Sequence, residues 1–126
     1  MFESYDFVEV LYRSVSWNKR ALPDNTLEMQ FNKVESEIEE AKEADDRQDE
    51  EGCLEEAADI LIAICGIARF DWINFLNYLY TYVDGYPLDW ELTIKRAKEK
   101  LDELETRRYH LVETPRGREY QHVVLQ

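Results

Sequence analysis

Apolar and small side chains recur at intervals of three and four residues along most of the chain, which is the spacing of one face of an α-helix. The first such stretch continues to about Trp17, where a polar segment that contains Pro23 interrupts it. Its spaced positions are Ser4, Val8, Leu11 and Val15. We expect a first helix that ends near Trp17, before the proline, which cannot extend a helix.

Two more stretches show the same spacing. Thr26 is expected to cap the second helix, because its hydroxyl can accept a hydrogen bond from an open amide of the next turn. This helix runs to about Asp46, and the last helix runs from near Asp89 to Arg108. The apolar positions are Leu27, Phe31, Val34, Ile38 and Ala41 in the second helix, and Trp90, Ile94, Ala97, Leu101 and Leu104 in the last.

The segment between these helices is apolar on almost every side. Its run from Cys53 to Ala68 predicts a third helix that lies at the centre of the fold. Asp71 can cap a fourth helix, Trp72 to Val83, unless this segment continues the third helix with a bend. Gly85 and Pro87 then break the chain.

These elements predict an all-α fold, a bundle of four to five helices. With 126 residues the chain is long enough for one domain, which we place at residues 1–114. Residues 115–126 are expected to form a short C-terminal tail. The end of this tail, from His122 to Leu125, fits either a short strand or a disordered segment.

Charge narrows the choice of partners. The chain has 28 acidic and 15 basic residues, and therefore a formal net charge of −13. Such a surface repels nucleic acid polymers and anionic lipids, since both are bound through Lys and Arg. The sequence has no apolar run of membrane-spanning length and no signal peptide, and its two cysteines fit reduced thiols. We expect a cytoplasmic protein that binds neither nucleic acid polymers nor membranes.

The motifs that are missing direct attention to carboxylates. None of the four glycines lies in a phosphate-binding loop, and both histidines fall near the end of the sequence. The histidine ligands of a zinc or di-iron site are therefore lacking, as is a Ser-His-Asp triad. If the protein is an enzyme, acidic side chains must carry its chemistry.

The second helix gathers acids and polar groups beside its apolar stripe. At about 100° per residue, Gln30, Lys33, Glu37 and Glu40 fall on the same flank of this stripe. The segment is so acidic that a pair such as Glu37 and Glu40 is expected from composition alone. A solvated acidic face therefore stays the alternative interpretation.

Asp59 is the stronger signal, because it is the only polar residue in the apolar run 57–68. A buried carboxylate must be neutralised, paired or bound to a metal ion. Glu56 lies on the same face and carries the same charge. Docking Glu37 and Glu40 against this face would gather four acids, and oxygen ligands without His or Cys favour Mg²⁺ or Mn²⁺. A pair between Asp59 and an Arg or Lys of another helix fits the spacing equally well.

The acids Glu37 and Glu40, followed by Glu56 and Asp59, form an ExxE…ExxD pattern. It resembles the motif of the MazG-like, all-α nucleoside triphosphate pyrophosphatases, a superfamily that includes dCTP pyrophosphatases and dimeric dUTPases. The resemblance covers about residues 15–109. It implies Mg²⁺-dependent hydrolysis of a (deoxy)nucleoside triphosphate to the monophosphate and pyrophosphate, with these four acids as metal ligands and catalytic residues. It also implies a site built between subunits, so we expect a dimer or a tetramer.

Basic and aromatic side chains supply candidate substrate contacts. Arg96, Lys100 and Arg107 align on one flank of the last helix, where they can face phosphates or form a solvated face. Trp17 can stack on a base, although a Trp at a helix end often anchors a core. The candidate substrate-binding residues are Trp17, Gln30, Lys33, Arg96, Lys100 and Arg107.

The sequence thus predicts a hydrolase that cleanses or adjusts the nucleotide pool. The alternative belongs to another class, a non-catalytic acidic helical protein that binds a basic partner or mimics DNA. This alternative explains the charge well, but it explains Asp59 poorly, because mimicry needs exposed acids.

Overall fold

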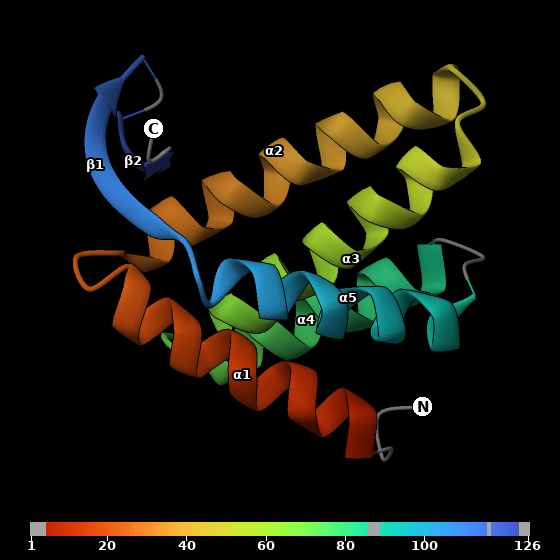
Figure 1. The fold of residues 1–126 in the computed structure, drawn as a ribbon, viewed down its shortest axis with the longest axis horizontal. Helices are drawn as coiled ribbons and strands as arrows, with labels where there is room; N and C mark the ends of the chain where they lie inside the picture. Colours follow the sequence, from red (N-terminus) through yellow and green to blue (C-terminus); the bar gives the residue numbers. More distant parts are fainter. Residues whose placement is uncertain (1–4, 86–88, 116, 124–126) are drawn as a thin grey trace.

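The computed structural model describes residues 5–85, 89–115 and 117–123. Within these residues the chain forms five α-helices and one antiparallel β-hairpin (Figure 1). The helices are α1 (Tyr5–Ala21), α2 (Leu27–Asp46), α3 (Glu50–Ile67), α4 (Trp72–Gly85) and α5 (Trp90–Leu104), and the strands are β1 (Arg108–Thr114) and β2 (Gly117–Val123). The predicted all-α bundle is confirmed, with the hairpin added to it.

Capping side chains fix where the helices begin. Thr26 accepts a hydrogen bond from an amide in the first turn of α2, as predicted. Asp49 does the same for α3, so this helix begins at Glu50 rather than at Cys53. Asp71 accepts from an amide in the first turn of α4, which is therefore a separate helix and not a continuation of α3.

The central position of α3 is confirmed. It packs against α1, α2, α4 and α5, and almost every side chain from Ala57 to Ile67 is buried. Its antiparallel neighbour is α2, and the two helices extend together beyond the rest of the bundle (Figure 1). The other helices contribute fully buried side chains to the same core, among them Val10, Val34, Phe75 and Leu101. The acids of α2 and α3 therefore lie on neighbouring helices.

Two of the helices, α1 and α4, end where chain-breaking residues occur. α1 reaches Ala21, past the predicted end near Trp17, because polar side chains alone do not stop a helix, whereas Pro23 does. α4 ends at Gly85. None of the helices in the described part of the chain is long and apolar enough to cross a membrane.

The C-terminal region differs from the predicted helix end and tail. α5 ends at Leu104 rather than at Arg108, and β1 and β2 pair along their whole length. Tyr109 and Leu111 alternate with polar residues before a turn that contains Pro115 and Gly117, and this favours a hairpin over a helix. In the turn, Gly117 has a φ of 109°, which glycine adopts readily, and Thr114 Oγ1 donates to its carbonyl at 2.8 Å. Of the strand expected near the C-terminus, residues 124–125 lie outside the described residues.

Candidate functional site

A cleft of about 480 Å³ opens between the helices and the hairpin. It is lined by residues of α1 and of the connection that follows, by α2 from Met29 to Glu40, by α3 and α5, and by the hairpin. The hairpin stands at the N-terminal end of α2 (Figure 1). The volume lies within the range of roughly 300–1,000 Å³ that is typical of small-molecule sites.

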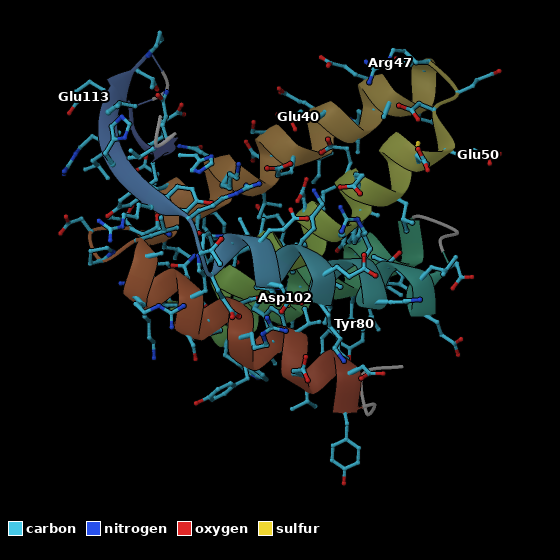
Figure 2. The ribbon with its side chains drawn as sticks, in the orientation of Figure 1. Glu40, Arg47, Glu50, Tyr80, Asp102 and Glu113 are labelled. Atoms are coloured by element: carbon cyan, nitrogen blue, oxygen red, sulfur yellow. The ribbon has the colours of Figure 1, made fainter. Side chains whose placement is uncertain are left out.

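Three carboxylates meet where α2 and α3 face each other. Glu37 of α2 lies beside Glu56 and Asp59 of α3, with one ligand oxygen from each all within 4.8 Å of one another. Glu56 and Asp59 share a face because they lie about one helical turn apart. Glu40, in the middle of α2 (Figure 2), borders the cleft and adds its negative charge to that of Glu56. The structure therefore brings together the four acids that the sequence grouped.

Two buried oxygens of this cluster, Glu37 Oε2 and Glu56 Oε2, have no hydrogen-bond partner among the described residues. Glu37 is only 6% exposed. A buried carboxylate oxygen without a partner is costly, because it has lost the hydrogen bonds that water would supply. A proton on Glu56 can join its carboxyl to Glu37 while no metal is bound. A divalent cation between the two helices would replace this proton and satisfy both oxygens, and the all-oxygen donor set fits Mg²⁺ or Mn²⁺.

Crowding of negative charge changes the pKa values of these acids. Burial, and then the neighbouring Glu37, raise the pKa of Glu56 to about 8. Burial and the charge of Glu37 also raise the pKa of Glu40. Burial raises the pKa of Asp59 as well, although Lys100 beside it acts in the opposite direction. A bound cation would favour the ionised carboxylates and reverse these shifts.

Two lysines neutralise part of this charge. Lys33 Nζ lies 2.7 Å from Glu37 Oε1. Lys100 Nζ, from α5, lies 3.1 Å from Asp59 Oδ1 and 2.7 Å from Glu55 Oε2. The structure thus contains the pair with a basic residue that the sequence left open for Asp59. Because Lys100 also holds Glu55, this pair and a metal site are compatible.

The predicted row of cations on the last helix is divided. Arg96 pairs with Glu55 and Glu99, and it is not among the described residues that border the cleft. Lys100 does border the cleft. Arg107 borders it too, but from the chain beyond the end of α5 rather than from the helix itself. Lys100 and Arg107 therefore remain candidates for phosphate contacts.

Buried amide side chains behind the cleft link α1, α2 and α3. Gln30 Nε2 donates to the Ala63 carbonyl at 2.7 Å. Gln30 Oε1 accepts from Asn18 Nδ2 at 3.0 Å and from Asn25 Nδ2 at 2.8 Å. Arg69 Nη1 donates to Asn18 Oδ1 at 2.9 Å. Gln30 borders the cleft, as expected of a substrate contact, but its amide also holds the helices together. Sequence analysis did not identify its three polar neighbours.

Aromatic side chains of α1 and the hairpin border the same cleft. Trp17 is 9% exposed, and its Nε1 donates to the Leu104 carbonyl at 3.0 Å. Its ring packs edge to face against the ring of Tyr109, with 5.6 Å between the ring centroids. These contacts favour the core-anchor interpretation of Trp17. The ring centroids of Tyr109 and of His122, on β2, lie 5.8 Å apart. Sequence analysis missed Tyr109, which follows the predicted last helix, and His122, which it placed in the tail. Pro115 and Gly117 were a usable turn signal between the two.

Comparisons with known proteins do not assign the chain to a family. No family model, curated protein or solved structure matches it. Membership of the MazG-like superfamily therefore stays a prediction that rests on Glu37, Glu40, Glu56 and Asp59. The case for a function depends on the cleft itself, on its carboxylates, its lysines and its volume.

Proposed function

We propose that the protein is a Mg²⁺-dependent nucleoside triphosphate pyrophosphohydrolase, which converts a (deoxy)nucleoside triphosphate to the monophosphate and pyrophosphate. The observation that carries this proposal is the pair of buried oxygens, Glu37 Oε2 and Glu56 Oε2, that lack a hydrogen-bond partner among the described residues. They belong to one cluster with Asp59. Mn²⁺ can take the place of Mg²⁺, because both prefer oxygen ligands.

The position of each carboxylate determines its proposed part in metal binding. Glu37, Glu56 and Asp59 would hold the cation, and Glu40, on the exposed side of α2, would be a further ligand. When bound, Mg²⁺ neutralises the phosphates and lowers the pKa of the attacking water. The rigid packing of α2 against α3 fixes the place of the phosphates relative to these acids.

Lys100 can exchange one of its two carboxylate partners for an anionic substrate. Lys100 bridges Asp59 and Glu55. With Asp59 engaged as a metal ligand, the ammonium of Lys100 would keep Glu55 and could donate its other hydrogens to phosphate oxygens. Arg107 adds a second positive charge on the same side of the cleft. Both charges then stabilise the departing pyrophosphate.

The bond to be cleaved follows from the resemblance of the acidic motif to the pyrophosphatases. Purified protein is incubated with each common (deoxy)nucleoside triphosphate and Mg²⁺, and pyrophosphate and orthophosphate are both measured. We expect pyrophosphate and monophosphate in equal amounts, without orthophosphate. Stoichiometric orthophosphate would contradict cleavage at the α phosphorus. Absence of any product would favour the non-catalytic acidic protein instead.

A matched pair of variants on α2 tests the part played by the cluster. Glu37→Gln removes a buried ligand and should lower kcat by about a hundredfold or more, as the loss of a strong electrostatic contact does. Glu43→Gln makes the same chemical change at an exposed position on the opposite flank, and it should leave kcat unchanged. An equal loss of kcat in both variants would indicate that the acids of α2 act only through their general negative charge.

A further inference from the structure

One face of the hairpin presents aromatic rings and a cation to the cleft. Residues opposite each other in an antiparallel pair point to the same side. The register places Tyr109 opposite His122 and Leu111 opposite Tyr120. Of this face, the two tyrosines, His122 and Arg118 all border the cleft. The hairpin is therefore a side wall of the site and not a free tail.

Two contacts hold this wall against the helices. The Asp24 amide donates to the hydroxyl of Tyr120 at 2.7 Å, which joins β2 to the connection between α1 and α2. Trp17 of α1 meets the ring of Tyr109 edge to face. The ring of Tyr109 is thus supported at one edge by the helices while it borders the open cleft.

The two ends of the cleft differ in chemistry. Glu37, Glu40 and Asp59 border the cleft with Lys33 and Lys100 toward the middle of α2, where a cation and phosphates would be held. Toward the hairpin, the lining includes Tyr109 and His122, with Met29 and Asn32 of α2. Arg118 and Glu119 of β2 border the cleft there as well, and Arg118 is paired with Glu113 across the hairpin. Burial raises the pKa of the Tyr109 phenol, although Arg107 acts in the opposite direction. Rings, a thioether and an amide suit a planar, uncharged group and not a second polyanion.

We infer that the hairpin is the base-binding wall of the cleft, with Tyr109 and His122 in contact with the heterocyclic ring of a nucleoside whose phosphates lie at the carboxylate cluster. This inference rests on the proposed function and names the side chains that recognise the organic part of the substrate. Stacking on aromatic rings depends little on base identity. The wall is therefore expected to favour binding of nucleotides over bare polyphosphates. Discrimination among bases would depend on the polar groups nearby.

The test compares two ligands that differ by the nucleoside. One is an α,β-methylene nucleoside triphosphate, which resists cleavage, and the other is inorganic tripolyphosphate, both titrated into the full chain with Mg²⁺. Wild type should bind the nucleotide more tightly. Tyr109→Leu and His122→Ala should each weaken nucleotide binding by about tenfold or more, and leave tripolyphosphate binding unchanged. His110→Ala and Gln121→Ala, on the outer face of the hairpin, are the matched controls and should change neither affinity.

A third variant tests the support of the wall. Tyr120→Phe keeps the ring but removes the hydroxyl that binds the Asp24 amide, so nucleotide affinity should fall while tripolyphosphate affinity stays. Unchanged nucleotide binding in Tyr109→Leu and His122→Ala would overturn the inference. Equal losses for both ligands would also overturn it. If wild type binds both ligands equally, the inference fails and the phosphate site survives. If wild type binds neither, the proposed function fails too.

Discussion

The carboxylate of Asp59 lies between a lysine and two other acids. It pairs with Lys100, and its oxygens are also close enough to Glu37 and Glu56 to share a cation with them. Lys100 has a second partner in Glu55, at 2.7 Å. Loss of the Asp59 charge therefore does not leave the ammonium without a carboxylate, and it relieves repulsion within the cluster.

Asp59→Asn tests whether Asp59 is a metal ligand or a structural partner of Lys100. With EDTA, the free energy of unfolding should stay within about 1 kcal/mol of wild type, because Lys100 keeps Glu55. With Mg²⁺ at a hundred times its Kd, wild type should gain about 2.7 kcal/mol, and the variant much less. Thermal melts of both proteins in the two buffers measure this. A variant that loses about 3–5 kcal/mol with and without Mg²⁺ would instead show that the pair with Lys100 is structural.

The raised pKa of Glu56 predicts how stability depends on pH in the metal-free protein. Folded Glu56 holds its proton up to about pH 8, whereas in the unfolded chain it ionises near its ordinary pKa of 4.5. Between these values the folded state binds more protons, so stability falls as pH rises. Melts in EDTA from about pH 5 to pH 9 should show this decline. Glu56→Gln should flatten it, and an equally steep decline in this variant would contradict the assignment.

Spacing predicted which acids meet, but not what else they touch. The positions of Glu37 and Asp59 follow from helical periodicity and from the lack of a polar neighbour in an apolar run. The second partner of Lys100 does not follow, because the rotation of α5 against α3 depends on packing between distant segments. The same limit applies to Arg96, which turns toward Glu55 and away from the cleft.

At the scale of helices, α1, α2 and α3 meet at a point where there is no room for an added methyl group. A Cβ on Gly66 of α3 would lie 2.9 Å from Gln30 Cδ and 3.0 Å from Asn18 Nδ2. These amides cannot move aside easily, because both are buried and Gln30 is bonded to the Ala63 carbonyl. Close approach at Gly66 therefore determines how the first half of α2, with its cleft residues, lies on α3.

Gly66→Ala should lower the free energy of unfolding by about 1–3 kcal/mol, despite the better helix propensity of alanine, because overpacking forces the amide network apart. Denaturant titration measures the loss. Gly85→Ala is the matched control, since a Cβ there meets nothing within 4 Å, and it should change stability by less than about 0.5 kcal/mol. A neutral result at Gly66 would show that the helices adjust freely.

Helices were easier to predict than the hairpin for a physical reason. The buried face of a helix can be recognised within a single segment of sequence, as the apolar spacing of three and four residues in α2 and α5 shows. Strand β1 has seven residues, and which of its side chains share a face with those of β2 depends on the register between the two strands. Tyr109 and His122 become site residues once this pairing is known, so a reading of one segment at a time does not find them.

At the scale of the whole molecule, α4 exposes three large apolar side chains. Ile73 is 71% exposed, Trp72 is 55% exposed and Tyr80 is 53% exposed. At helical spacing these side chains fall within one arc of α4. Exposed aromatic and aliphatic groups on one face are typical of a protein interface. We propose that copies of the chain associate through this face as a dimer or tetramer.

Ile73→Asp places a charge on this face and should shift the protein toward the monomer in sedimentation or light-scattering measurements, because an interface does not tolerate an unpaired buried charge. Thr81→Asp adds the same charge to α4 at an exposed position outside the arc, and it should leave the assembly intact. Wild type that sediments as a monomer at all concentrations would contradict the proposal.

The carboxylates and the aromatic wall differ in how far apart their parts lie along the chain. Glu37, Glu56 and Asp59 come from consecutive helices, whereas the bond between Asp24 and Tyr120 joins residues 96 positions apart. Contacts that close short loops form before those that close long ones, and segments made earlier on the ribosome can fold earlier. The carboxylates should therefore assemble first and the wall last. A newly made chain would gain the ability to hold a cation before it could tell a nucleotide from a bare polyphosphate.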